Sequence, residues 1–188
     1  MPSPRNISRE DAEEAWPSVL SRAFQMFAYY HWWTFVQLHP DVSNDPSSIV
    51  LSNAALVSSL MSIRDLDDFF CSRPKFADDL VVSDYGFPSA RNYLSKDERE
   101  AINKKLTHLT YRSVHELRDD PMCKNPRTWN NADLVNRAMT RWLEFMDHLE
   151  FSFFDKDPLQ QKLIQTARRT IQLSLANIDK IARNEMDF

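Results

Sequence analysis

Gly86 is the one glycine among the 188 residues of this chain. Average usage would give roughly thirteen glycines in a chain of this length. Tight hairpin turns, dinucleotide-binding turns and phosphate-binding loops need glycine, because their backbone takes positive φ or lies close to a ligand. The near-absence of glycine therefore disfavours hairpin-rich β folds and the common nucleotide-binding folds, and it favours helices.

The composition is that of a folded, soluble chain: 43% of the residues are apolar and 27% are charged. We predict a single domain spanning 1–188, which is long enough to bury a core without disulfides or metals. The net charge is -4, and residues 1–94 carry 7 basic and 12 acidic side chains, against 16 and 15 in residues 95–188. Neither half has the clustered basic excess typical of proteins that hold duplex nucleic acid, which leaves a local groove as the remaining way to bind it.

The cysteines and the apolar stretches bear on the compartment. Cys71 and Cys123 lack metal-ligand or redox spacing, so we expect reduced thiols. Residues 1–14 are polar and lack the apolar run of a signal peptide. We interpret the longest apolar stretches as interrupted well short of a membrane span. These features predict a cytoplasmic protein without membrane contact.

Helix start signals recur along the chain. Ser8 followed by Asp11 resembles a capping box, and Ser95 with Glu98 is the clearest capping box of the sequence. Asp45 and Asp157 each precede a proline, which is the pattern of an N-cap before the first helical position. The expected helices cover 8–40 with a kink or effective start at Pro17, 46–73, a short segment from 95, a segment from 130 or 131, and a segment from 157.

Apolar periodicity gives these helices an inner face. In the fourth, residues at three- and four-residue spacing are expected to face the core: Val135, Ala138, Trp142, Phe145 and Leu149. In the fifth they are Leu163, Ala167, Ile171, Leu175, Ile178 and Ala182. We predict an all-α, single-domain bundle of four to five mostly antiparallel helices. Its long loops, near 74–94 and 113–129, are of a length that often carries function.

Arg64 falls within a largely apolar stripe of the second predicted helix. Helical spacing places on one side Asn53, Leu56, Val57, Leu60, Arg64, Asp67 and Cys71, and leaves Ser58, Ser62 and Asp65 to solvent. A partly buried arginine needs a carboxylate, and Asp67 and Asp68 are the nearest. Either a structural ion pair at the edge of the core or part of a functional site would produce this pattern.

His108 is the other centre of a candidate site. Lys105, His108 and Arg112 lie at i, i+3 and i+7 beside an apolar stripe. A histidine near arginines and a carboxylate can act as general acid or base, and arginine can stabilise a phosphate or a developing anion. A histidine that merely donates to a backbone carbonyl would show the same pattern. The candidate set is catalytic His108, Arg64 and Arg112, with Lys105, Asp67, Asp68, Asp79 and Asp84 as binding residues.

Metal and cofactor chemistry have little support in the sequence. The five histidines include no pair at i, i+4 and no H-E-x-x-H arrangement. Adjacent carboxylates such as Asp78 and Asp79 are usually solvated surface, although they could hold a hard cation. No serine or cysteine lies in a nucleophile elbow. We therefore predict neither a metal nor an organic cofactor.

The first predicted helix has aromatic residues on all of its sides. Residues 24–35 include Tyr29, Tyr30, Trp32 and Trp33. A single neighbouring core cannot cover every side of a helix, and aromatic side chains are favoured at buried interfaces. We therefore expect part of this set to contact another subunit, which predicts a homodimer.

Three segments, 64–70, 78–84 and 102–110, resemble a set of small bacterial helical proteins to which no activity is attached. More distantly, the arrangement is similar to HEPN-type helical bundles, which are typically dimeric and, in active members, cleave RNA without metal through an R-x(4-6)-H motif. Arg141 and His148, with six residues between them, match that spacing. The resemblance implies nucleic-acid binding or metal-independent RNA cleavage, with these two as a second catalytic pair. The alternative is a non-enzymatic protein-interaction module or a structural homo-oligomer.

Overall fold

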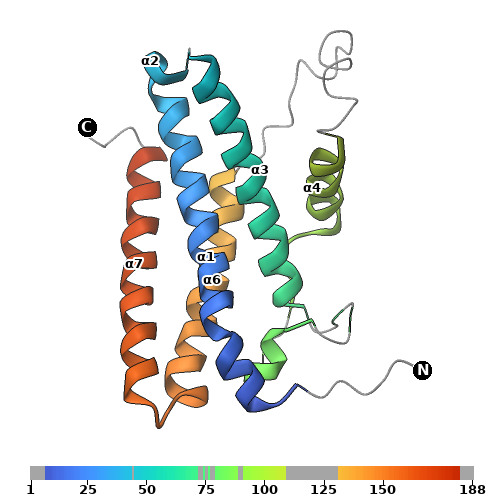
Figure 1. Ribbon diagram of the computed structural model, residues 1–188, viewed down its shortest axis with the longest axis vertical. Helices are drawn as coiled ribbons and strands as arrows, with labels where there is room; N and C mark the ends of the chain where they lie inside the picture. The colour runs from blue at the N-terminus through green and yellow to red at the C-terminus, as the bar shows by residue number, and fades with distance from the viewer. Residues whose placement is uncertain are drawn as a thin grey trace.

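The computed structural model describes residues 7–43, 45–71, 74, 76, 79–88, 91–108 and 131–182. Within these residues the chain is all-α, with five long helices and no strand, as predicted. Figure 1 shows α1 and α3 side by side, with the turn that joins them at one end of the molecule, and α4 at the outer edge beside α3. The helix α6 packs against α1, α3 and α7. The elements are α1 (Arg9–Leu38), α2 (Pro40–Ser43), α3 (Pro46–Phe69), the 3-10 turn η1 (Val82–Tyr85), α4 (Lys96–His108), α6 (Asn131–His148), the π turn η3 (Leu149–Phe153) and α7 (Pro158–Ala182).

Both predicted capping boxes are confirmed. The Asp11 backbone N–H donates to Ser8 Oγ at 3.1 Å, and the Ser8 N–H donates to Asp11 Oδ2 at 2.8 Å. At the start of α4 the Ser95 N–H donates to Glu98 Oε2 at 2.7 Å, and the Glu98 N–H donates to Ser95 Oγ at 3.2 Å. Each box satisfies two backbone N–H groups that have no partner within the helix.

The two aspartate caps are also confirmed. Asp45 Oδ2 accepts from the Ser48 N–H at 2.8 Å, and Asp157 Oδ1 accepts from the Leu159 N–H at 3.0 Å. The helix that Asp45 opens ends at Phe69, whereas the sequence predicted an end near 73. Beyond Phe69 the bonding tightens, since the Cys71 N–H donates to the Asp68 carbonyl, three residues back, at 3.2 Å. Such short-range bonds are typical of a helix terminus.

The buried face of α3 differs from the predicted one. Ser62 was expected in solvent but is 3% exposed, whereas Arg64, placed in the core stripe, is only half-buried. The face toward α1 is built largely from small residues, and Ser59 Oγ donates to the Met26 carbonyl at 3.5 Å. The Ser62 hydroxyl donates to the Ser58 carbonyl at 2.9 Å, which offsets the cost of burying it. Serines whose hydroxyls bond to the helix backbone can therefore be buried, although a prediction from hydropathy and spacing places them in solvent.

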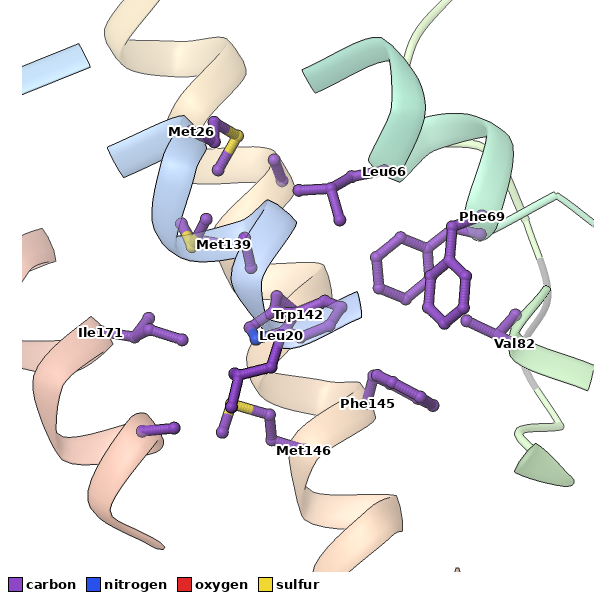
Figure 2. Packing of buried hydrophobic residues seen from close by; sticks show 14 of the residues in the cluster. Leu20, Met26, Leu66, Phe69, Val82, Met139, Trp142, Phe145, Met146 and Ile171 are labelled. Carbon is purple, nitrogen blue, oxygen red and sulfur yellow. The ribbon is translucent and has the colours of Figure 1, made fainter. Parts of the chain in front are cut away.

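Aromatic side chains from α1, α3 and α6 form the centre of the core. Figure 2 shows those of Phe69 from α3 and of Trp142 and Phe145 from α6. The rings of Trp16 and Trp142 stack with centroids 5.9 Å apart, and Phe69 and Phe145 meet edge to face at 5.4 Å. All five residues predicted to face the core from the fourth helix are fully buried, four of them in α6 and Leu149 in η3. In α7, Ala167 and Ile171 are buried as expected, but Leu163 is 42% exposed, so that part of the predicted face was wrong.

Gly86 occupies a position that requires glycine. It follows η1 with φ of 69°, in the left-handed region that L side chains rarely adopt. The turn delivers the next residue, Phe87, to the core, where its ring lies 5.5 Å from that of Phe145. The one glycine of the chain thus sets the path of the segment that covers α6.

Candidate functional site

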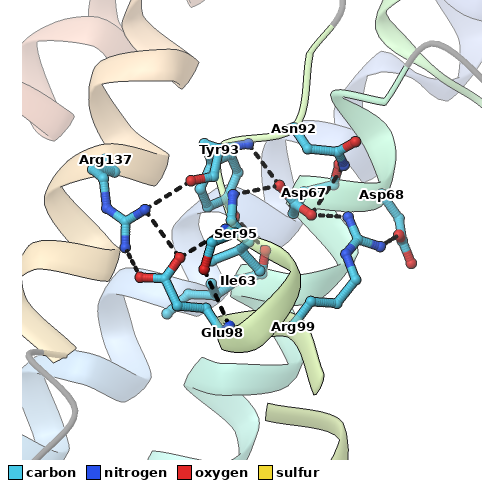
Figure 3. A network of polar contacts seen from close by, with 10 residues as sticks. Ile63, Asp67, Asp68, Asn92, Tyr93, Ser95, Glu98, Arg99 and Arg137 are labelled. Atoms are coloured by element: carbon cyan, nitrogen blue, oxygen red, sulfur yellow. Dashed lines mark hydrogen bonds and ion pairs between the residues drawn. The ribbon is translucent and has the colours of Figure 1, made fainter. Parts of the chain in front are cut away.

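The Asp67 carboxylate, at the end of α3, is fully buried and accepts hydrogen bonds from several groups (Figure 3). Its Oδ1 accepts from the backbone N–H groups of Tyr93 and Leu94, at 2.7 and 2.9 Å. Its Oδ2 accepts from Asn92 Nδ2 at 3.0 Å and pairs with the Arg99 guanidinium. A buried carboxylate held in this way fixes the 92–94 segment to α3.

Arg99, rather than Arg64, is the arginine that pairs with Asp67. It also pairs with Asp68, and its side chain is 24% exposed. Burial lowers the pKa of the Arg99 guanidinium, and the positive charge of Arg64 acts in the same direction. Sequence spacing named Asp67 and Asp68 as the nearest carboxylates to Arg64 on the same helix, whereas the arginine that pairs with both of them comes from α4. Arg64 instead lines a cleft of about 480 Å³, together with Asp79 and Cys71.

Arg137 of α6 forms the second half of this polar network. Its guanidinium pairs with Glu98, donates to Asp133 Oδ2 at 2.9 Å and donates to the Tyr93 carbonyl at 2.8 Å. The hydrogen bond from Arg137 holds the pKa of Glu98 below its usual range, and the same bond raises the pKa of Arg137. The network therefore joins α3, α4 and α6 around the 91–95 segment, and its acidic groups are engaged in structural contacts.

The remaining members of the predicted His108 site are not brought together within the described residues. The backbones of Lys105 and His108 lie in α4, but their side chains, and all of Arg112, lie outside the described part of the chain. Asp79 Oδ2 accepts from the Phe76 N–H, and Asp84 Oδ2 accepts from the Val81 N–H, each at 2.8 Å. Each of these two carboxylates thus accepts a hydrogen bond from the backbone N–H three residues before it.

Arg141 and His148 lie on the same helix but line different clefts. His148 Nε2 donates to the Tyr85 carbonyl at 2.8 Å, in a small cleft that Arg9 also lines. The Arg141 side chain is 5% exposed and pairs with Glu144. The Phe87 ring contacts both, with its centroid 5.1 Å from Arg141 Cζ and 5.5 Å from the His148 ring. The two residues that match the R-x(4-6)-H spacing therefore do not converge on one opening.

The cleft at Arg141 is more basic than the clefts at Arg64 and at His148, and the sequence analysis did not predict it. Its volume is about 370 Å³, and Arg91, Arg137 and Arg141 line it together with the single acid Glu144. Asn92, Tyr93 and Thr140 complete the lining. Arg137 and Arg141, at i and i+4, were a visible signal of a basic helix face, but nothing in the sequence placed Arg91 beside them. We call this the arginine cleft.

Large apolar side chains are exposed in the parts of α1 and α3 that lead to α2. Figure 1 shows that α2 lies at one end of the α1–α3 hairpin. We call this set the uncharged end: Tyr29, Trp32 and Phe35 of α1 and Ile49, Val50 and Leu51 of α3, which are 37% to 67% exposed. Residues 23–40 and 46–63 contain no Asp, Glu, Lys or Arg. The Trp32 and Phe35 rings stack at 5.8 Å, and the Phe35 and His39 rings at 4.1 Å. Of the aromatic residues predicted at an interface, Tyr30 is buried and Trp33 half-buried, which leaves Tyr29 and Trp32 at the surface.

The helix α3 is long and apolar enough to cross a membrane, by length and composition only. The expectation that every apolar stretch is too short was wrong for this helix, in which the serines do not interrupt the apolar run: the Ser62 hydroxyl, for example, donates to the Ser58 carbonyl one turn before it. About a third of the most apolar stretch of α3 is buried inside the molecule. One such helix also occurs in the cores of soluble proteins.

Comparison of the chain with protein-family models, with curated proteins and with solved structures finds no match. No family is identified, and the similarity to HEPN-type bundles remains an expectation from sequence. Among the described residues, no group of three histidine, cysteine, aspartate or glutamate side chains is arranged to hold a metal ion. The fold and its surfaces define the chain as an all-α helical bundle with an uncharged, partly exposed end.

Proposed function

We propose that this protein is a non-enzymatic interaction module that self-associates through the uncharged end. The observation that carries the proposal is the exposure of Trp32, at 43%, and Val50, at 67%, in a region without charged side chains. Monomeric proteins rarely leave large apolar groups gathered at a surface, since covering apolar area gains about 25 cal/mol per Å². Burial of this end against a partner would recover that free energy.

Charge favours a second copy of the chain as the partner. Two copies that pack side by side through residues 23–40 and 46–63, with the exposed Asp41 and Asp45 of the tip left in water, meet without like-charge repulsion, and a two-fold axis makes such a surface its own complement. An interfacial membrane helix would instead carry lysine or arginine along its polar face. The residues nearest the tip are acidic, Asp41 and Asp45, and anionic lipid repels them. The exposed aromatic groups belong to the types enriched at the centres of protein interfaces.

Metal-independent RNA cleavage is the competing function. It depends on His108 and Arg112, whose side chains lie outside the described residues, and on Arg141 with His148, which line separate clefts. If our proposal holds, the wild-type protein leaves single-stranded RNA intact in the presence of a chelator. Chelator-resistant cleavage that His108→Ala or His148→Ala abolishes without unfolding the protein would favour the enzyme instead.

Sedimentation equilibrium over a range of concentrations tests self-association. We expect the wild type to reach twice its chain mass of 22.1 kDa at micromolar concentration. Val50→Lys should remain monomeric there, because a lysine buried without a partner costs about 3 kcal/mol, more than a hundredfold in Kd. The matched control is Leu173→Lys, which adds the same charge at a 59% exposed leucine of α7 and should leave the mass unchanged.

Three results would contradict the proposal. The wild type could remain monomeric at high micromolar concentration, or the two lysine variants could dissociate to the same extent. Alternatively, the monomeric wild type could float with anionic lipid vesicles, and Val50→Lys fail to do so, which would assign the uncharged end to a membrane.

A further inference from the structure

The arginine cleft is a second surface, separate from the uncharged end. Two of its guanidiniums come from successive turns of α6, at Arg137 and Arg141, and the third comes from Arg91, just before the segment that Asp67 anchors. The Arg137 guanidinium is held by Glu98, Asp133 and the Tyr93 carbonyl. The Arg137 guanidinium is therefore held in a fixed position in the lining of the cleft.

Buried Arg141 lies on the aromatic core. Its Cζ is 5.1 Å from the ring centroid of Phe87 and 5.5 Å from that of Phe70. These rings and the pairing with Glu144 hold its guanidinium at the wall of the cleft. A guanidinium placed in this way loses little entropy when it binds an anion, because its rotamer is already fixed.

Glu144 is the single acid that lines the cleft, and its side chain is 48% exposed. It lies three residues after Arg141, so it can rotate toward solvent without disturbing the helix. The carboxylate occupies the position on Arg141 that an external anion would take. Three arginines and one acid thus line the cleft; Arg137 is already paired with Glu98 and Asp133, which are not part of the lining, so Glu144 is the acid that a ligand in the cleft would displace.

From this arrangement we infer that the arginine cleft binds a phosphate group, with Glu144 as the internal anion that the ligand displaces. A phosphate dianion offers several oxygens to guanidinium donors from different directions, whereas a carboxylate offers two in one plane. Arg91, at the exposed rim, would close over the phosphate. Free phosphorylated small molecules and the backbone of a single-stranded RNA share this chemistry.

The test is a titration with inorganic phosphate at constant ionic strength, followed by NMR or calorimetry. We expect Arg91→Ala to weaken phosphate binding about tenfold, equivalent to about 1.4 kcal/mol. Glu144→Gln should strengthen binding severalfold, because it removes the competing charge and keeps the side-chain shape. Arg169→Ala, at an exposed arginine of α7, removes the same charge elsewhere and should leave the affinity unchanged. Arg91 is exposed, so its loss should not unfold the bundle.

Competition identifies the source of the phosphate. If a short single-stranded oligoribonucleotide displaces inorganic phosphate at lower concentration than a nucleoside monophosphate does, the site accepts a polymer backbone; the opposite order indicates a small ligand. Either order supports the site. The inference fails if neither wild type nor Glu144→Gln binds inorganic phosphate at millimolar concentration, or if Arg91→Ala and Arg169→Ala weaken phosphate binding equally.

Discussion

At the scale of single residues, the fold depends on a few buried charges. Asp67 is the clearest, because its carboxylate is fully buried and holds two backbone N–H groups together with Arg99. Removing one partner of a buried ion pair leaves the other charge uncompensated, and that cost exceeds the net value of the pair. Two substitutions test this description.

Asp67→Asn removes the negative charge with little change of shape. We expect it to lower the free energy of unfolding by about 3 kcal/mol, because Arg99 then keeps only Asp68 as a counter-charge. Urea unfolding measures the change, and Asp155→Asn, at an exposed aspartate after η3, is the control, with an expected change of about 0.5 kcal/mol or less. Equal effects of the two variants would mean that the Asp67 network does not anchor the 92–94 segment.

Glu98→Gln tests the link between α4 and α6. The hydrogen bond from Arg137 lowers the pKa of Glu98, so the ionised form stabilises the folded state above the ordinary glutamate pKa, and this stabilisation is lost as the pH falls through the lowered value. We expect the variant to be about 1 kcal/mol less stable than wild type at pH 7, and the difference to vanish in acid. The Glu100 carboxylate lies at the surface, 3.9 Å from the Lys96 amine, so Glu100→Gln should be as stable as the wild type. If the difference in stability between Glu98→Gln and wild type persists in acid, the ionised Glu98 is not what links α4 to α6.

At the scale of secondary-structure elements, the starts of the helices can be predicted from the sequence more accurately than their buried faces. Caps are local, since Asp45 and Ser95 act on residues three positions away, and their patterns are visible in sequence. The turn at Gly86 is local as well, because its positive φ favours glycine over residues that carry a Cβ.

Gly86→Ala should lower stability by about 1 kcal/mol through backbone strain. A Cβ at this position would lie 3.8 Å from His148 Nε2, an ordinary contact, so crowding adds little. Gly86→Asn is the informative partner variant, because asparagine tolerates the left-handed region and should recover part of the loss. Thermal unfolding of both distinguishes strain from crowding: if asparagine is worse than alanine, side-chain bulk is responsible.

Those parts of the fold and of the candidate site that depend on contacts distant in sequence could not be predicted. Arg99 reaches Asp67 across 32 residues, so the arginine on the same helix, Arg64, looked like the better partner. The arginine cleft requires Arg91 to meet α6, which only the packing of the 91–95 segment brings about. The buried serine face of α3 was missed because hydropathy favours Leu56 and Val57, both only partly buried. By contrast, the α6 face was predictable, since large apolar residues there follow the helical period.

At the scale of the whole molecule, polar anchoring and apolar exposure occupy different regions. The charged network joins the end of α3 to α4 and α6, whereas the opposite end of the α1–α3 hairpin has no charged side chain in 23–40 or 46–63. The hairpin is therefore held firmly at one end and presents apolar groups at the other. A bundle built in this way is suited to pair through its apolar end while the rest of its surface stays in water.

Hydroxyl-radical footprinting at low and high protein concentration tests this central claim most directly, because it reads the solvent access of individual side chains. Self-association through the uncharged end predicts that the modification rates of Trp32, Phe35 and Leu51 fall as concentration rises. Phe151 and Leu159, which are 70% and 75% exposed at another part of the surface, should react at an unchanged rate. Rates at the uncharged end that do not depend on concentration, or an equal fall at Phe151 and Leu159, would contradict the claim.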